Sequence, residues 1–145
     1  MATRTARTAW DGPIQEGSGQ VELTSSGTGT FDVSFPRRIA DSAEGVTSPE
    51  ELIAAAHSSC FAMQLAGFIG EAGAEPVRLQ ITADVSVGPD PEGGLHLTEI
   101  KLTVRGEVPG IDEAKFNELA EKTKVGCPVS KALAAVPMTV EAALD

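Results

Sequence analysis

The stretch SPEELIAAAHSSCFAMQLAGFIG, residues 48–70, decides the fold, because it predicts one long α-helix with clear signals at both ends. Ser48 suits the N-cap, Pro49 suits the first helical position, and Glu51 completes the S-x-x-E pattern of a capping box. Good helix formers continue as far as Gly73, which suits the residue after the C-cap. The predicted helix has roughly 24 residues and is ~36 Å long.

Apolar side chains lie on almost every face of this helix. The large ones are Leu52, Ile53, Phe61, Met63, Leu65, Phe68 and Ile69. A helix that is apolar all round must be covered all round, and a chain of 145 residues has difficulty covering so long a helix alone. We therefore expect an obligate homodimer, in which a second copy covers the remaining faces.

The same stretch is long enough to raise the question of a membrane-spanning segment. Four polar side chains interrupt its apolar run, namely His57, Ser58, Ser59 and Gln64. We interpret it as a buried helix and expect no membrane partner. The N-terminus MATRTARTAWDG lacks the apolar run of a secretory signal, so we expect a cytoplasmic protein in a reducing compartment.

Composition and charge narrow the class of protein further. The chain has 41% hydrophobic and 22% charged residues, which is typical of a soluble globular protein, and its length fits one domain over residues 1–145. The formal net charge of -10 repels phosphate backbones, so we expect no nucleic-acid partner.

Short strands are expected before the helix, at residues 3–11, 18–25 and 31–35. The third has apolar and polar side chains in alternation, the period of a half-buried strand, and Pro36 ends it. Residues 37–47 are expected to form a polar loop.

A long hairpin is expected after the helix, with alternating strands over residues 77–87 and 95–104. The apolar positions change from odd to even numbers near Thr98-Glu99, which predicts a β-bulge there. An amphipathic helix should follow, and a last strand should come near the C-terminus. The expected helix covers residues 112–125, with Phe116, Leu119 and Ala120 facing inward, and the expected strand covers residues 138–142.

Cys60 lies in the middle of the long predicted helix. Taken alone, it fits a buried small hydrophobe. A reactive Cys60 would have to lose its proton near pH 7, and the helix macrodipole fades within the first turn, too far away to help. A cation would have to come from elsewhere, and Arg37 and Arg38 are the obvious candidates, although an isolated arginine pair also fits a solvated loop.

Cys127 lies in the sequence VGCPVSK, residues 125–131. Pro128 places it at the N-cap of a short helix expected to continue to about Ala135, where free N–H groups stabilise a thiolate. This suits a resolving cysteine, and it equally fits a cysteine that the N-cap merely tolerates. Glu50 is similarly ambiguous, since an acid in the first turn of a helix is favourable in itself.

A zinc site of Cys60, His57 and Cys127 is conceivable, since His57 and Cys60 share a helical face. Structural zinc sites usually have four ligands, often in closely spaced pairs. We therefore expect no metal.

Two motifs identify a resemblance to a known family. TSPEELIAAAHSSCFAM, residues 47–63, closely resembles the helix motif of the OsmC/Ohr peroxidases, and CPVSK, residues 127–131, resembles their second cysteine motif. The Ala-Ala-His before Cys60 is more similar to the OsmC branch. The resemblance covers nearly the whole chain. It implies an α+β fold, with two long helices packed centrally in an intertwined homodimer and antiparallel β-sheets wrapped around them.

The resemblance also implies an activity and a set of site residues. It implies a Cys-based peroxidase of the oxidative and osmotic stress responses that reduces organic hydroperoxides, and hydrogen peroxide more weakly. Cys60 would be the peroxidatic cysteine and Cys127 the resolving one, while an arginine and Glu50 polarise the site. The context Phe-Pro-x-Arg favours Arg38 over Arg37. No cofactor is implied, and an external dithiol, possibly lipoyl-type as in the Ohr branch, would restore the thiols.

Helix geometry adds a constraint on these residues. Glu50 and Cys60 are separated by ten positions on one predicted helix, which is ~15 Å along its axis. If both belong to one site, we expect Glu50 to come from the other subunit. We also expect apolar pocket walls from Phe61, Met63, Phe68 and neighbouring strands, which would favour alkyl hydroperoxides over hydrogen peroxide.

Three other interpretations stay open on the sequence alone. The chain could be a non-catalytic member of the fold that binds a small apolar ligand in the same cavity. It could be a redox sensor that signals by forming a disulfide, although nothing in it resembles an effector module. In a purely structural interpretation, the grouping of Arg38, Glu50, Cys60 and Cys127 is a coincidence.

Overall fold

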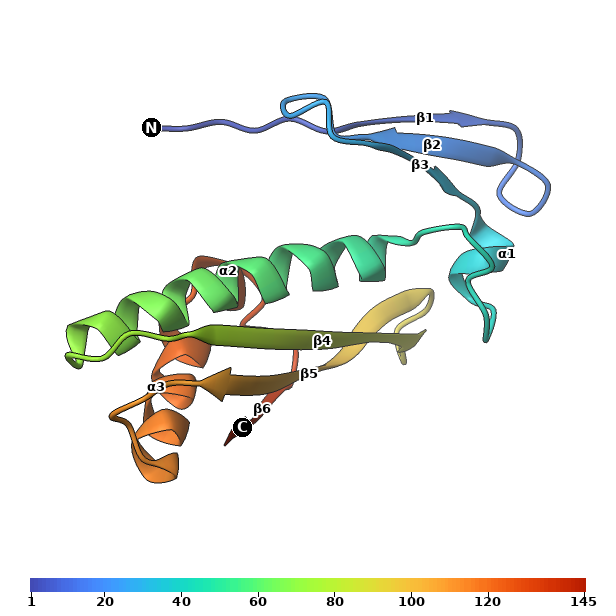
Figure 1. Ribbon diagram of the computed structural model, residues 1–145. Coiled ribbons are helices and arrows are strands. Elements are labelled where there is room, and N and C mark those ends of the chain that lie inside the picture. Colours follow the sequence, from blue (N-terminus) through green and yellow to red (C-terminus); the bar gives the residue numbers. More distant parts are fainter. The chain divides into compact units, whose positions relative to one another are not determined.

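The computed structural model describes residues 1–145, which form two compact units. The N-terminal unit is Met1–Leu52 and the C-terminal unit is Ile53–Asp145. Each unit contains a three-stranded sheet (Figure 1). The mixture of helices and two small sheets confirms the predicted α+β class.

The sheet of the N-terminal unit contains strands β1, β2 and β3 in that order, each antiparallel to its neighbour. Their bounds are Arg7–Asp11, Ser18–Glu22 and Thr30–Val33. The three strands predicted before the long helix are therefore present, and each is shorter than expected.

A short helix, α1 (Phe35–Arg38), replaces the predicted end of the third strand and the start of the predicted loop. Ser34 is its N-cap, because its hydroxyl accepts a hydrogen bond from the backbone N–H of Arg37. Pro36 lies in the first turn, where a proline ring already has a helical φ and the missing N–H costs nothing. The interpretation of Pro36 as only a strand terminator was wrong.

Helix α2 (Pro49–Glu71) confirms the long helix. The Ser48 hydroxyl accepts from the backbone N–H of Glu51, and Gly73 follows the helix with a φ of 84°. The reciprocal half of the capping box is absent, because the Glu51 carboxylate accepts a hydrogen bond from the Thr47 hydroxyl. By length and composition alone, α2 could also cross a membrane.

Burial along α2 follows a single stripe with a spacing of four residues. His57, Phe61, Leu65 and Ile69 are fully buried, while Met63 is 73% exposed. A spacing of four keeps side chains on one face of a helix, so the C-terminal unit buries that one face of α2.

The sheet of the C-terminal unit contains β4 (Arg78–Pro89), β5 (Leu95–Glu107) and β6 (Met138–Leu144). The β4–β5 hairpin is antiparallel, and Thr98 is the extra residue at the register shift between Ser86 and Val87, which confirms the predicted bulge. Strand β6 pairs with β5 in parallel, so this sheet is mixed and the expectation of antiparallel pairing throughout was wrong. A parallel neighbour requires a long crossover, which the two following helices supply.

The crossover contains α3 (Glu113–Gly126) and α4 (Pro128–Ala132). Asp112 caps α3 by accepting a hydrogen bond from the N–H of Lys115. The predicted inward residues of α3 are confirmed, and Thr123 is a fourth buried residue that was not predicted. Helix α4 ends three residues before the predicted Ala135.

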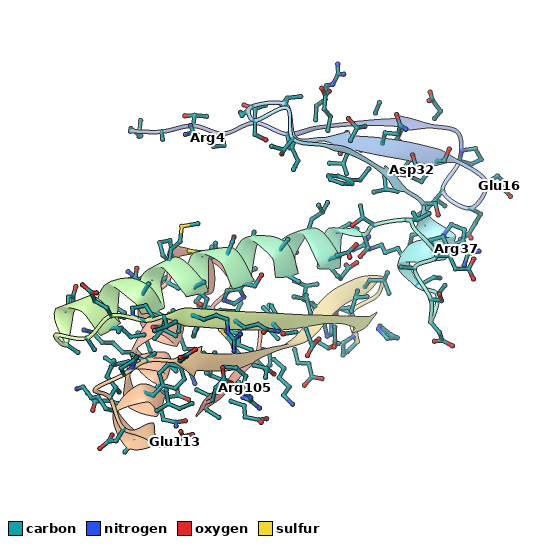
Figure 2. The ribbon with its side chains drawn as sticks, viewed as in Figure 1. Arg4, Glu16, Asp32, Arg37, Arg105 and Glu113 are labelled. Atoms are coloured by element: carbon teal, nitrogen blue, oxygen red, sulfur yellow. The ribbon has the colours of Figure 1, made fainter.

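The core of the C-terminal unit lies between the sheet and the helices. Alternate residues of β5 (Ile100, Leu102 and Val104) pack against the buried stripe of α2 and against α3. The opposite face of the sheet is polar, and Arg105 there pairs with Glu141 of β6 (Figure 2). The sheet is therefore covered by helices on one face only in a single chain.

Replacing Phe116 by Ala tests this core. Its ring is fully buried and lies so close to Gly106 that a Cβ there would be 2.7 Å from the ring. We expect the Phe116→Ala variant to lose about 3–5 kcal/mol of unfolding free energy. The Val125→Ala variant, in the same helix at a side chain 71% exposed, should change by less than about 0.5 kcal/mol. Urea unfolding followed by circular dichroism measures both, and equal losses would contradict this core assignment.

Candidate active site

The two sulfur atoms meet in the C-terminal unit. Cys60 Sγ, in the middle of α2, lies 3.1 Å from Cys127 Sγ, and both cysteines are free thiols. Either sulfur can donate the hydrogen bond at this distance. A disulfide needs about 2.0 Å between the sulfurs, so a small movement of one side chain would close the bond.

Cys127 is held at the junction of two helices. It is at once the C-cap of α3 and the N-cap of α4, with an extended backbone between the two helical segments. Its own N–H donates to the carbonyl of Thr123, and its carbonyl accepts from Lys131. These bonds fix its backbone, and its side chain is fully buried.

The acidity of Cys127 depends on hydrogen bonds from α4. Burial raises the pKa of the Cys127 thiol, but the backbone N–H of Ser130, the Cys60 thiol and the Ser130 hydroxyl outweigh burial and hold the pKa below its usual range. Hydrogen bonds to a thiolate stabilise the charged form. The arrangement therefore favours Cys127 as the thiolate of the pair.

Cys60 has the opposite tendency. Burial raises the pKa of the Cys60 thiol, and so does the adjacent Cys127, while a backbone hydrogen bond from Val129 lowers it. No cation contributes to this balance in the single chain. The requirement inferred from the sequence, a positive charge beside Cys60, is thus not met within the C-terminal unit.

The predicted cation and acid meet in the N-terminal unit. Both carboxylate oxygens of Glu50 accept from Arg38 Nε, and Oε1 also accepts from Arg38 Nη2 at 2.7 Å. Glu50 is only 6% exposed. Its hydrogen bond raises the pKa of Arg38 further above its ordinary value. A fork of this kind fixes the plane of a guanidinium as well as its position.

The structure distinguishes the two adjacent arginines. Arg37, labelled in Figure 2, pairs with Glu44, and its side chain is partly exposed while that of Glu44 is exposed. Arg38 is the one that contacts Glu50. The register follows from α1, because successive residues of a helix point about 100° apart.

A buried pair lies behind Cys127 that the sequence did not reveal as part of the site. His57 Nε2 is 2.7 Å from the Ser130 hydroxyl, and His57 Nδ1 has no hydrogen-bond partner. Ser130 was missed, although its place three residues after Cys127, in the first turn of the next helix, was a usable signal. No three His, Cys, Asp or Glu side chains in residues 1–145 lie close enough together to hold a metal ion.

An apolar cavity of about 570 Å³ lies in the N-terminal unit and includes Arg38 in its wall. Its other lining residues are Thr8, Trp10, Ile14, Val21, Val33, Ser34, Phe35, Thr47, Pro49 and Leu52. The expected wall residues are elsewhere: Phe61 is fully buried in the core, Met63 is exposed, and Phe68 packs against the core. Apolar walls therefore accompany Arg38; strands supply part of them, as expected, but none of the three named side chains does.

Replacing His57 by Gln gives a test of the buried histidine. Burial lowers the pKa of folded His57 below its ordinary 6.5. As the pH falls below about 6.5 the unfolded chain binds the proton first, so the folded state loses stability towards acid. The His57→Gln variant should lack this loss, which reaches about 1.4 kcal/mol per pH unit. Urea unfolding of both proteins between about pH 8 and pH 5 measures the difference, and parallel curves would contradict it.

Residues 42–141 match the family described as OsmC-like protein. Peroxiredoxin OsmC of Escherichia coli (strain K12) is 41% identical over 126 residues, which are 87% of this chain and 86% of that protein. The organic hydroperoxide resistance protein of Xanthomonas axonopodis pv. citri is 29% identical over 101 residues, which are 69% of this chain and 68% of that protein.

A solved structure shows the same architecture. The organic hydroperoxide resistance protein of Elizabethkingia anophelis superposes with a TM-score of 0.81 at 26% identity, covering 100% of this chain and 98% of that one. The α+β fold with its long helix is thus shared with a solved hydroperoxide resistance protein. From the family match over residues 42–141 and the 41% identity to the E. coli protein, this chain belongs to the OsmC-like protein family.

Proposed function

We propose that this chain is a thiol peroxidase that reduces organic hydroperoxides to alcohols through Cys60 and Cys127. The observation that carries the proposal is the 3.1 Å contact between the two sulfurs. Relatives named peroxiredoxin and organic hydroperoxide resistance protein support the same activity.

The proposed cycle uses the two sulfurs in turn. The Cys60 thiolate attacks the outer oxygen of the peroxide, the O–O bond breaks, and the alcohol leaves while Cys60 becomes a sulfenic acid. The Cys127 thiolate then attacks the Cys60 sulfur and releases water after protonation, which forms the disulfide. An external dithiol reduces that disulfide and is itself oxidised.

Cys60 needs a cation for the first step, and we assign this role to Arg38, held by Glu50. Opposite charge beside a thiol lowers its pKa, and a guanidinium can also hydrogen-bond a peroxide oxygen. Glu50 and Cys60 both lie in α2, ~15 Å apart along the axis for ten residues. We therefore propose that Arg38 and Glu50 of one copy complete the site around Cys60 of a second copy.

The uncovered face of α2 supports the homodimer. The large side chain on it is the exposed Met63, and its other members are small: Ala56, Ser59, Gly67 and Gly70 are all exposed. A Cβ added at Gly67 or Gly70 would meet nothing within 4 Å. Small residues allow two helices to approach closely, so a second copy of α2 fits this face.

The substrate class follows from the cavity beside Arg38. Its walls are mostly apolar, with one charged group, Arg38, among them. Apolar walls bind the carbon skeleton of an alkyl hydroperoxide, and hydrogen peroxide has none. We propose a preference for organic hydroperoxides, with hydrogen peroxide as a weaker substrate.

The remaining partners are also proposals. The cycle needs no resident cofactor, only an external dithiol of the lipoyl type, and it requires the reducing conditions of the cytoplasm to keep both thiols free. The net charge of -10 is unfavourable for nucleic acid and anionic membranes. Ligand binding without catalysis is the second candidate function, favoured by the apolar cavity and by the raised pKa of Cys60.

Peroxide consumption by cysteine variants tests the cycle. With cumene hydroperoxide and a lipoyl dithiol, the Cys60→Ser variant should be inactive, because no sulfenic acid can form. The Cys127→Ser variant should turn over poorly, because the disulfide cannot form. The wild type should consume hydrogen peroxide more slowly than cumene hydroperoxide, and equal rates would remove the proposed preference. Ordinary alkylation reactivity of Cys60 at pH 7, without turnover, would favour the ligand-binding function.

Heterodimers test the shared site. An Arg38→Ala chain and a Cys60→Ser chain, co-expressed with different tags and purified through both, place one intact Arg38 opposite one intact Cys60. If the site is shared, each heterodimer has one complete site and about half of the wild-type activity, because a two-fold dimer has two equivalent sites. Each homodimeric variant is the control and should be inactive or nearly so. An inactive heterodimer would mean that Arg38 and Cys60 of the same chain act together.

A further inference from the structure

The buried pair His57–Ser130 reaches the first turn of α4, the helix that Cys127 begins. Its place beside Cys127 points to the reduction of the disulfide and not to the attack on the peroxide. We propose that the Ser130 hydroxyl, positioned by His57, stabilises Cys127 as the leaving thiolate when the disulfide is reduced, so that the external thiol attacks Cys60. This inference rests on the proposed disulfide cycle, and it assigns the two sulfurs different roles in its last step.

The tautomer of His57 follows from its surroundings. His57 is fully buried, its Nδ1 has no partner, and its Nε2 is 2.7 Å from the Ser130 hydroxyl oxygen. Burial lowers the pKa of His57, so the ring is neutral near pH 7 and has one N–H. A buried N–H without an acceptor costs more than a buried lone pair without a donor. The proton is therefore on Nε2, and His57 donates to Ser130.

This tautomer directs the Ser130 hydroxyl proton. A hydroxyl that accepts from His57 keeps its own O–H for another acceptor. The Ser130 side chain is only 3% exposed and lies in the first turn of α4, three residues after its N-cap Cys127. Ser130, through its hydroxyl and its backbone N–H, lowers the pKa of the Cys127 thiol, and the N–H of Val129 lowers it too. The proposed order of donors therefore runs from His57 through Ser130 to Cys127.

The two sulfurs also differ in their exposure to solvent. Cys127 is fully buried, whereas Cys60 is partly exposed in the chain. An external thiolate must approach the sulfur that it attacks in line with the S–S bond, and within one chain Cys60 is the sulfur with exposed surface. The sulfur left behind is then Cys127, the one that the donors face.

The bonds and electrons of the step balance. The external thiol gives its proton to solvent, and its sulfur forms a bond to Cys60 Sγ while the Cys60–Cys127 bond breaks. The electron pair of the broken bond stays on Cys127 Sγ as a thiolate. The second thiol of the reductant then attacks the first, closes a cyclic disulfide and releases Cys60. A leaving thiolate of lower pKa leaves faster, so the donors that face Cys127 accelerate the first of these exchanges.

The test begins from the disulfide itself. Diamide oxidises the purified full chain to the Cys60–Cys127 disulfide without any peroxide. Excess 2-mercaptoethanol followed by N-ethylmaleimide then labels the two sulfurs differently, and peptide mass mapping finds which one carries which label. We expect mercaptoethanol on Cys60 and maleimide on Cys127, and the reverse pattern would overturn the proposal.

Reduction rates test the role of the pair. With dithiothreitol at pH 7, we expect the disulfide of the Ser130→Ala variant to be reduced about tenfold more slowly, since it loses a hydrogen bond to a charged sulfur. The His57→Leu variant should also be slower, and His57→Gln, whose amide can donate from the position of Nε2, should recover most of the rate. Ser42→Ala, at an exposed serine of the loop before α2, is the matched control and should equal the wild type.

The outcomes separate this inference from the proposed peroxidase. Wild-type rates in both Ser130→Ala and His57→Leu would overturn it, as would equal slowing in His57→Gln and His57→Leu, which indicates only a packing role. If His57→Leu does not fold, Ser130→Ala and His57→Gln decide. These assays contain no peroxide, so they can be interpreted even if the chain has no peroxidase activity. If diamide forms no disulfide, the disulfide cycle and this inference both fail.

Discussion

Burial of one stripe of α2 against the sheet of the C-terminal unit is the interaction on which the site depends. His57, Phe61, Leu65 and Ile69 occupy that stripe, and the alternate apolar residues of β5 face it. Cys60 lies next to Phe61, at the margin of the stripe. The packing of α2 therefore sets the position of Cys60 and the direction in which its side chain points. The same packing orients His57 towards Ser130. The contact between the sulfurs is thus a consequence of core packing and needs no bond of its own.

The contact also divides the two thiols by acidity. Cys127 lies where two helices meet, and groups of α4 lower the pKa of its thiol. The pKa of the Cys60 thiol is raised, mainly by burial. In a single chain, the pKa of Cys127 is therefore lowered and the pKa of Cys60 is raised. The guanidinium of Arg38 is oriented by Glu50 in the other unit of the chain. The N-terminal and C-terminal units each supply half of the chemistry that the proposed peroxidase needs.

Much of this fold was predictable because its signals are local. Capping residues marked both ends of α2, and a change of parity marked the bulge at Thr98. Helix α1 was missed because Pro36 fits both the end of a strand and the first turn of a helix, and only Ser34 as a cap distinguishes the two. The parallel pairing of β6 was missed because it depends on the path of the crossover through α3 and α4, which no local pattern encodes.

The residues of the candidate site were also found from local motifs. Cys60, Cys127, Arg38 and Glu50 were all identified from motifs, and the structure brings them together in two pairs, one in each unit. The choice between Arg37 and Arg38 required the register of α1. The contact of His57 with Ser130 joins residues 73 positions apart, and such pairs are specified by tertiary packing alone.

The bulge at Thr98 shows how one residue can keep a strand in phase. Before Thr98, the inward positions of β5 are odd-numbered, and after it they are even-numbered. The partner strand β4 has no extra residue at the register shift. Side chains of a strand alternate between faces. Without this extra residue, Leu95 and Leu97 at the hairpin tip would turn to the face that carries Arg105. Their apolar side chains would then be exposed to solvent on the polar face of the sheet. Thr98 shifts the register of β5 by one residue. A bulge also increases the local twist of a strand, which bends the hairpin tip away from the plane of the sheet.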